Sequence, residues 1–186
     1  MGGRSRKLCG VRRIGPGWTL NEKGHAVNAV LLSLGVGVII EPDLSLLTLE
    51  AVAMVTPPIV LGALFPDLDT TFGTHRKTFH NVWVLAIAVA FPHVFGNLRF
   101  VWIGIGTHYV LDLLGNVKGM AVFHPLPGFY DLPVGVDVTS RWADVVTLAV
   151  TAFELALLGA LVVLGHEAQL ARPDLPVPVR SMLISG

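Results

Sequence analysis

Five apolar segments divide this chain, and they constrain its fold more than any other feature of the sequence. None of the five contains Lys or Arg, and polar or Gly/Pro-rich stretches separate them. The segments are Ala26–Ile40, Leu46–Phe65, Val82–Phe95, Phe100–Leu114 and Ala143–Leu164. A membrane-spanning helix needs roughly 17 to 25 mostly apolar residues. The pattern therefore predicts an all-α, multi-span transmembrane bundle of about five helices.

Composition supports this class of protein. The chain is 53% hydrophobic and 14% charged, whereas about a quarter of the residues in a soluble domain are charged. The formal net charge is zero, so no direct nucleic-acid binding is expected. The single cysteine, Cys9, cannot form an internal disulfide or a Cys-x-x-Cys metal site.

We expect one transmembrane domain over residues 24–165. A basic segment, residues 1–23, precedes it, and a loosely ordered, Pro-containing tail, residues 166–186, follows it. The basic start and the first apolar run together resemble a signal peptide. However, Glu41-Pro42-Asp43 stands where a cleavage site would need small residues, so we interpret the run as an uncleaved first span.

Local signals refine the expected helices. Pro57-Pro58 should bend the second helix without ending it, because neighbouring helices can satisfy the freed carbonyl groups. Gly96-Asn97 predicts a tight antiparallel hairpin between the third and fourth helices. Residues 115–142 form a long Gly/Pro-rich connection, which makes them a candidate lid or site-lining loop.

The distribution of basic residues predicts which side of the membrane each loop faces. If every apolar segment crosses once, ten Lys and Arg residues share one face: Arg4, Arg6, Lys7, Arg12, Arg13, Lys23, Arg76, Lys77, Lys118 and Arg141. The other face holds three: Arg99, Arg172 and Arg180. By the positive-inside rule, the first face is cytoplasmic. We therefore expect a multi-pass protein of the cell (inner) membrane.

Side chains that can bind a metal gather at this same face. The group comprises His25, Asp67, Asp69, His75, His80, His108 and Asp112. His108 and Asp112 are four residues apart and therefore share one face of a helix. Because ionisable groups inside membrane spans are costly, they are usually functional. The alternative is a structural His/Asp pair that joins two helices.

The segments around Asp67 and His80 offer further ligands. In an extended turn after Pro66, the carboxylates of Asp67 and Asp69 could reach one cation or bridge two, although Asp after Pro is also ordinary turn chemistry. His75 and His80 lie five residues apart with Arg76 between them, which suits two metal ligands and a cation for an anionic oxygen. The alternative is a solvated interfacial loop that binds lipid headgroups.

A polar stripe marks the last apolar segment. It consists of Asp144, Thr147, Thr151 and Glu154, which recur at helical spacing and should face the bundle interior. Glu154 is a ligand, a proton carrier or a neutral, hydrogen-bonded buried acid, and we favour the last. No chemistry is assigned to Glu50, His93 or His166.

These motifs resemble those of the membrane-bound metal-dependent hydrolases that are also described as LexA-binding inner-membrane proteins (YdjM-like). The matching residues are His25, Phe65-Pro66-Asp67-Leu68-Asp69, His75-Arg76-Lys77-Thr78-Phe79-His80-Asn81 and His108-Tyr109-Val110-Leu111-Asp112. The resemblance covers about residues 24 to 127. Asn81 departs from a Ser that is common in the family, and His124-Pro125 departs from an apolar or aromatic residue before Pro. The family is itself distantly similar to zinc-dependent phospholipase C.

The resemblance implies a metal-dependent hydrolase. We expect one or more divalent cations, zinc first because of the imidazole content, to activate a water for attack on a phosphoester, such as that of a lipid headgroup. Asp67 or Asp69 would act as general base, and Arg76 with Lys77 would hold the phosphate.

The alternative is a non-enzymatic metal-binding membrane protein, either a cation transporter or a regulatory scaffold. Transport would favour acids at mid-membrane on several helices, and Glu154 alone is well placed for that. A regulatory partnership with a DNA-damage repressor is implied only by the description of the family.

Overall fold

The computed structural model describes residues 20–90, 98–114, 119–130 and 142–171. Within these ranges all regular structure is helical, apart from one isolated antiparallel bridge between Met120 and Tyr130. The longer helices are α1 (Leu20–Ile40), α2 (Leu46–Leu64), α4 (Val82–Ala90), α5 (Val101–Leu114) and α6 (Ala143–Ala171). Two single turns, η1 (Pro66–Leu68) and α3 (Asp69–Phe72), continue from the end of α2. The expected all-α class is confirmed.

Three helical stretches are long and apolar enough to cross a membrane. They are Lys23–Ile40, Leu46–Phe72 and Ala143–Gly165. The 14 residues of α5 span about 21 Å at about 1.5 Å per residue, which is less than the roughly 30 Å of a bilayer core. The third expected span, residues 82–95, is helical only to Ala90 before residues 91–97, which lie outside the described ranges. The described residues therefore fit a membrane protein with three long helices, and the five-span bundle is not confirmed.

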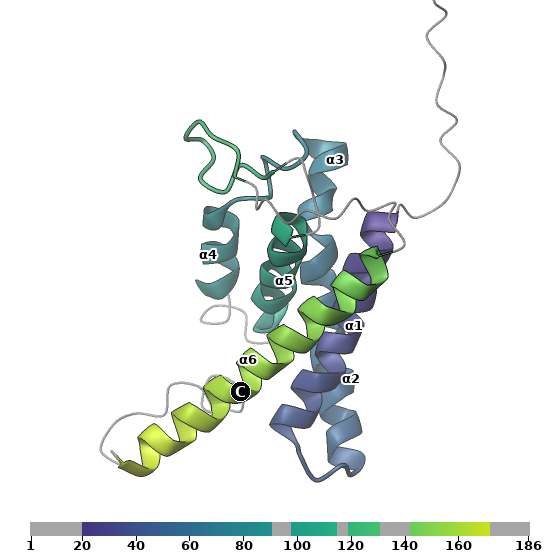
Figure 1. The fold of residues 1–186 in the computed structure, drawn as a ribbon, viewed down its shortest axis with the longest axis vertical. Helices are drawn as coiled ribbons and strands as arrows, with labels where there is room; N and C mark the ends of the chain where they lie inside the picture. Colours follow the sequence, from purple (N-terminus) through teal and green to yellow (C-terminus); the bar gives the residue numbers. More distant parts are fainter. Residues whose placement is uncertain (1–19, 91–97, 115–118, 131–141, 172–186) are drawn as a thin grey trace, which may run out of the picture.

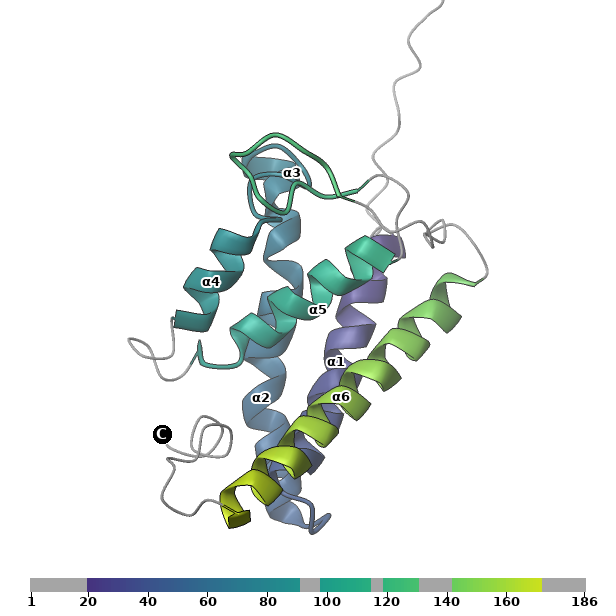
Figure 2. The same cartoon turned by 60° about the vertical axis from the view of Figure 1, so that its left-hand side comes forward.

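The helices share one polar end. Figures 1 and 2 show the beginnings of α1, α4 and α6 and the ends of α2 and α5 at the same end of the molecule. In both views α1 and α2 run alongside each other, while α4 and α5 lie only in the half of the molecule nearest that end. The His and Asp residues that we expected at one face are therefore carried by both short and long helices.

Two glycines bring α2 and α5 into close contact. A Cβ atom added to Gly104 would lie 2.0 Å from the carbonyl oxygen of Ile59, and one added to Gly62 would lie 2.1 Å from the carbonyl oxygen of Val101. Small residues allow helix backbones to approach in this way, as is common between membrane helices. The buried cluster around Val55 and Ile59 lies along the same contact.

Several local expectations need adjustment. The helix α1 begins at Leu20, so His25 lies inside it and does not open it. The expected extended turn at Asp67 and Asp69 is instead a 3-10 turn followed by a helical turn, because Pro66 provides the fixed φ that suits the first position of a helix. The helix α2 continues through Pro57-Pro58, as expected. The helix α6 extends to Ala171, six residues into the expected irregular tail.

Part of the expected lid folds onto the loop between α3 and α4. The backbone N–H of Ala121 donates to the carbonyl of Arg76 at 3.0 Å, and the N–H of Val82 donates to the carbonyl of Val122 at 2.8 Å. Residues 115–118 and 131–141 of this connection lie outside the described ranges. Residues 119–130 are thus part of the framework that positions the loop before α4.

Candidate metal centre

All seven expected ligands fall into three overlapping groups of His and Asp side chains. The groups are His25, His108 and Asp112; Asp67, His80 and His108; and Asp69, His75 and His80. In each group the potential ligand atoms lie within 4.8 Å of one another. The fold therefore brings together residues from α1, η1, α3, α5 and the loop before α4.

The two ring nitrogens at the centre of the cluster face each other. His80 Nε2 lies 3.0 Å from His108 Nε2, and Asp67 Oδ1 lies 4.0 Å from the first nitrogen and 3.8 Å from the second. Ligand atoms on a tetrahedral zinc ion lie about 3.3 Å apart, given bonds of about 2.0–2.1 Å. The three atoms are thus close to the spacing that a shared metal ion requires.

Hydrogen bonds at the opposite ring nitrogens assign the tautomers. His108 Nδ1 donates to the carbonyl of Ala63 at 2.6 Å, and His80 Nδ1 donates to Asp69 Oδ2 at 2.8 Å. Metal-bound histidines usually donate their second N–H to a carbonyl or carboxylate in this way. Each ring then directs an Nε2 lone pair toward the other, and two lone pairs in contact require a positive charge between them.

Asp112 supplies negative charge beside these nitrogens. Its Oδ2 lies 3.3 Å from His80 Nε2 and 3.9 Å from His108 Nε2, and its Oδ1 lies 3.4 Å from His25 Nε2. The His25 and His108 rings stack with their centroids 3.8 Å apart. The Asp112 carboxylate therefore borders three imidazoles.

Unpaired buried polar atoms show that the cluster suits a cation. Among the described residues, both ring nitrogens of His25, both carboxylate oxygens of Asp112 and Asp67 Oδ2 are buried without a hydrogen-bond partner. Leaving such atoms unpaired is costly, and native proteins rarely do so. Imidazole nitrogens and carboxylate oxygens are also the donor set of zinc sites. The residues present therefore fit a divalent metal ion.

The electrostatics at His80 point the same way. Burial lowers the pKa of His80, but the nearby Asp112 carboxylate, together with the attraction and hydrogen bond of Asp69, outweighs burial and raises the pKa above its usual value of 6.5. A raised histidine pKa means that the surroundings favour positive charge on the ring. A proton can supply this charge, and a bound metal ion would supply it in the same place.

Asp69 connects the outer histidine to the centre. It is fully buried, and its Oδ1 accepts a hydrogen bond from His75 Nδ1 at 2.9 Å while its Oδ2 accepts from His80. The side chain of His75 is 40% exposed. Asp69 therefore orients two imidazoles, and His75 forms the open side of the cluster.

The two basic residues of the loop have different surroundings. Arg76 is buried, and its guanidinium lies 3.7 Å from Asp112 Oδ1 and 3.4 Å from the carbonyl of Gly119. Lys77 lies over the Phe129 ring, with Nζ 5.7 Å from the ring centroid. Arg76 thus already has an anionic partner at the cluster, a contact that the sequence pattern did not indicate.

A buried polar network next to the cluster includes one residue that sequence reasoning missed. Asn28 hydrogen-bonds with Thr107 and Thr151, and Thr107 donates to Glu154 at 2.7 Å. Of the polar stripe expected to face the interior, Thr151 is buried and Glu154 is hydrogen-bonded, whereas Asp144 at the start of α6 is exposed. Asn28 lies three residues after His25 and so shares its face of α1, which is the signal that could have found it.

The three other histidines of the chain are His93, His124 and His166. His124 belongs to none of the groups of potential ligands among the described residues. His93 lies outside the described residues, and the side chain of His166 is not described.

Comparisons of the chain with models of protein families, with curated proteins and with solved structures find no match in any of the three. The resemblance to the YdjM-like hydrolases therefore stays an expectation from sequence motifs.

Proposed function

We propose that this protein is a membrane-bound, metal-dependent hydrolase that acts on a phosphoester. The observation that carries the proposal is the pair of Nε2 atoms of His80 and His108, 3.0 Å apart with the Asp67 and Asp112 carboxylates beside them. Zinc is the first choice because imidazole and carboxylate ligands suit it. The positive-inside pattern of the sequence supports a cytoplasmic orientation of this site in the inner membrane.

The chain's own residues would divide the work as follows. His80, His108 and Asp112 would hold the ion and leave a fourth position for water, with the unpaired ring nitrogens of His25 beside Asp112. A bound divalent ion supplies a nucleophile by lowering the pKa of water to about 7. Asp69 would keep the His80 ring in the tautomer that leaves Nε2 available.

One of the two aspartates after α2 would act as the general base. Both oxygens of Asp69 already accept hydrogen bonds from histidines, so Asp69 serves to orient them. Asp67 has a free carboxylate oxygen, Oδ2, and its side chain is 11% exposed. Between the two carboxylates, Asp67 is therefore better placed to accept the proton of the attacking water at Oδ2.

Substrate phosphate would enter on the open side of the cluster. His75 is the exposed ligand there, and Lys77 follows it by two residues. We assign Lys77 the role of phosphate contact, because a lysine ammonium binds phosphate as a point charge. Arg76 would balance the charge of Asp112 and help to position it.

The test is hydrolysis by the purified, detergent-solubilised protein. Bis(p-nitrophenyl) phosphate and phospholipid vesicles would be assayed before and after metal removal with a chelator, and again after zinc is restored. We expect activity to disappear with the metal and in Asp112→Asn, and to persist in Glu50→Gln, whose side chain is exposed on α2. Activity that survives both metal removal and Asp112→Asn would reject the proposal.

A cation transporter is the second candidate. The buried oxygen atoms of Asn28, Thr107, Thr151 and Glu154 favour it, because they continue from the metal cluster along α1, α5 and α6. Zinc uptake into proteoliposomes is the measurement that separates the two candidates. Uptake that depends on Glu154, without hydrolysis, would favour transport.

A further inference from the structure

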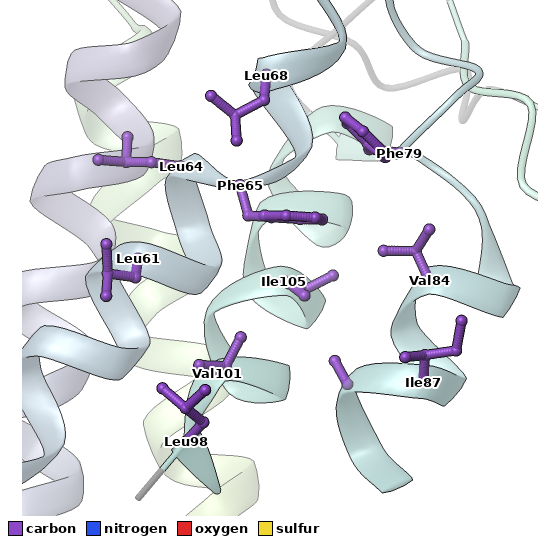
Figure 3. A pocket seen from close by; sticks show the side chains of 11 residues that line it. Leu61, Leu64, Phe65, Leu68, Phe79, Val84, Ile87, Leu98, Val101 and Ile105 are labelled. Atoms are coloured by element: carbon purple, nitrogen blue, oxygen red, sulfur yellow. The ribbon is translucent and has the colours of Figure 1, made fainter. Parts of the chain in front are cut away.

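An apolar groove lies between α2, α4 and α5, on the side where α4 stands away from α2 (Figure 3). Its volume is about 650 Å³ and all eleven residues that line it are apolar. Figure 3 shows Leu61 and Ile87 on opposite walls, Leu98 at one end and Leu68 with Phe79 at the other.

The groove has a packed floor and open walls. Ile105 and Ala88 are buried, whereas Leu61 is 61% exposed and Ile87 is 63% exposed. Leu61 lies within one of the three membrane-length helices. In a bilayer, the open side of the groove would therefore meet lipid chains and not water.

One end of the groove is lined by residues that neighbour the metal cluster in sequence. The centroids of the Phe65 and Phe79 rings lie 5.1 Å apart, and both rings line this end. Phe65 and Leu68 flank the turn that carries Asp67, and Phe79 directly precedes His80. The backbone N–H of Phe79 lies 3.5 Å from Asp69 Oδ2. A molecule in the groove would thus end beside the cluster.

The size and chemistry of the groove select its occupant. A three-turn helix about 10 Å across fills roughly 1,300 Å³, which is about twice the volume of the groove. An extended peptide would leave backbone N–H and C=O groups unpaired against apolar walls, which is costly. An acyl chain has no hydrogen-bonding groups, and the volume lies in the range of about 300–1,000 Å³ that is usual for small-molecule sites.

The loop that carries Phe79 also carries a cation. Lys77 lies two residues before Phe79, and a lysine of this loop would bind an anionic phosphate attached to a chain in the groove. Phospholipids carry an apolar chain and a phosphate in this arrangement.

We propose that the groove binds one acyl chain of a membrane phospholipid and so presents the lipid's phosphoester to the metal centre. This inference rests on the proposed hydrolase function and narrows its substrate to a lipid. The groove would orient the lipid, because an acyl chain held along α5 would place the headgroup at the His/Asp cluster.

Photolabelling tests the groove without relying on activity. The full chain would be reconstituted in vesicles of phosphatidylethanolamine and phosphatidylglycerol that contain phosphatidylglycerol with a diazirine in one acyl chain. After irradiation, mass spectrometry would locate the label. We expect residues of the groove to be labelled well above Phe153 and Leu157, which are exposed on α6 outside the groove.

Two tryptophan variants on one helix provide a matched pair. Ile87→Trp would fill the groove from its wall, and Val89→Trp adds the same side chain at an exposed position of α4 that does not line the groove. We expect labelling of the groove to fall about tenfold in Ile87→Trp, a factor that corresponds to about 1.4 kcal/mol of lost apolar burial, and to be unchanged in Val89→Trp. Leu61→Trp, on the opposite wall, repeats the test if Ile87→Trp does not fold.

The outcomes separate this inference from the hydrolase proposal. The acyl site would be overturned if the groove were labelled no more than α6, or if neither Ile87→Trp nor Leu61→Trp reduced its labelling. Exclusion of the probe by a second copy of the chain would also overturn it. Hydrolysis of bis(p-nitrophenyl) phosphate without groove labelling would overturn the acyl site and leave the hydrolase proposal standing. Specific groove labelling without any hydrolysis would support the acyl site and reject the hydrolase.

Discussion

At the scale of single residues, His80 joins the two halves of the metal centre. Its Nδ1 donates to Asp69, and its Nε2 lies beside both His108 and Asp112. Sequence reasoning treated Asp67 and Asp69 as equivalent carboxylates on one turn. The structure distinguishes them, because Asp69 is fully occupied by His75 and His80 while Asp67 keeps an unpaired oxygen.

Replacing Asp112 should weaken zinc binding. Asp112→Asn keeps the shape of the side chain but removes the negative charge beside three imidazoles. We expect its zinc affinity to fall by more than the roughly 10- to 100-fold that loss of an outer partner of a metal ligand costs. Metal analysis and zinc titration of the detergent-purified protein measure this.

Glu50→Gln is the control for that substitution, because Glu50 is an exposed acid on α2 outside the cluster. Its zinc affinity should equal that of the unmodified chain. Equal affinity in Asp112→Asn would remove Asp112 from the ligand set.

At the scale of helices, the contact between α2 and α5 places His108. The glycines at 62 and 104 let the two backbones meet, and His108 Nδ1 then reaches the carbonyl of Ala63 at 2.6 Å. The same contact supplies the tautomer that the metal site needs. Helix packing and site chemistry are therefore coupled.

Gly104→Ala tests this coupling. Its Cβ would lie 2.0 Å from the carbonyl oxygen of Ile59, so the helices must separate, and overpacking of this kind costs about 1–3 kcal/mol. We expect a lower melting temperature and weaker zinc binding, both measurable in detergent.

Gly106→Ala is the matched control on the same helix, because nothing lies within 4 Å of its added Cβ. Alanine is the better helix former, by about 1 kcal/mol, so this variant should be as stable as the original or more so. Identical behaviour of the two variants would show that close approach of α2 and α5 is unimportant.

The helix α6 is held to α1 by polar contacts. Thr151 is buried and donates to Asn28, whereas the hydroxyl of Thr147, one turn earlier, donates within its own helix to the carbonyl of Ala143 at 3.0 Å. We expect Thr151→Val to destabilise the protein by about 1 kcal/mol, the usual net value of a hydrogen bond, and Thr147→Val to have a smaller effect. Thermal unfolding in detergent compares them, and a larger loss in Thr147→Val would contradict the assignment.

At the scale of the whole molecule, the metal centre links parts of the chain that are distant in sequence. The ligands come from α1, the turns after α2, the loop before α4 and from α5. A bound ion would therefore act as a cross-link between elements that otherwise meet through apolar and glycine contacts. Because His25 and Asp112 have unpaired buried atoms, an ion bound between them would stabilise the folded chain.

Zinc should therefore stabilise the folded chain. At a free concentration about 100 times the dissociation constant, binding to the folded state adds about 2.7 kcal/mol. We expect the melting temperature to rise with zinc, to fall when a chelator is added, and not to respond to zinc in Asp112→Asn. Differential scanning fluorimetry in detergent measures these shifts, and an equal response of both proteins would place zinc elsewhere.

Much of this arrangement was predictable from local patterns. Apolar runs indicated helices near each observed position, and the four-residue spacing of His108 and Asp112 placed both on one face of α5. The lengths of α4 and α5 were harder to predict, since an apolar run does not distinguish a short buried helix from a full span. The contact of Arg76 with Asp112 was missed because Arg76 lies in the loop before α4 and Asp112 lies on α5, far along the chain.

The sequence alone determined the helical class, the apolar segments and the set of seven candidate ligands, because helix periodicity and the cost of burying charge act over short stretches of chain. Tertiary structure alone decided which nitrogen faces which carboxylate, which aspartate stays unpaired, and that an apolar groove ends at the cluster. Those features depend on how closely α2 approaches α5 and on where the loop before α4 crosses them. Such distances arise from packing between residues far apart in the chain, which no local pattern records.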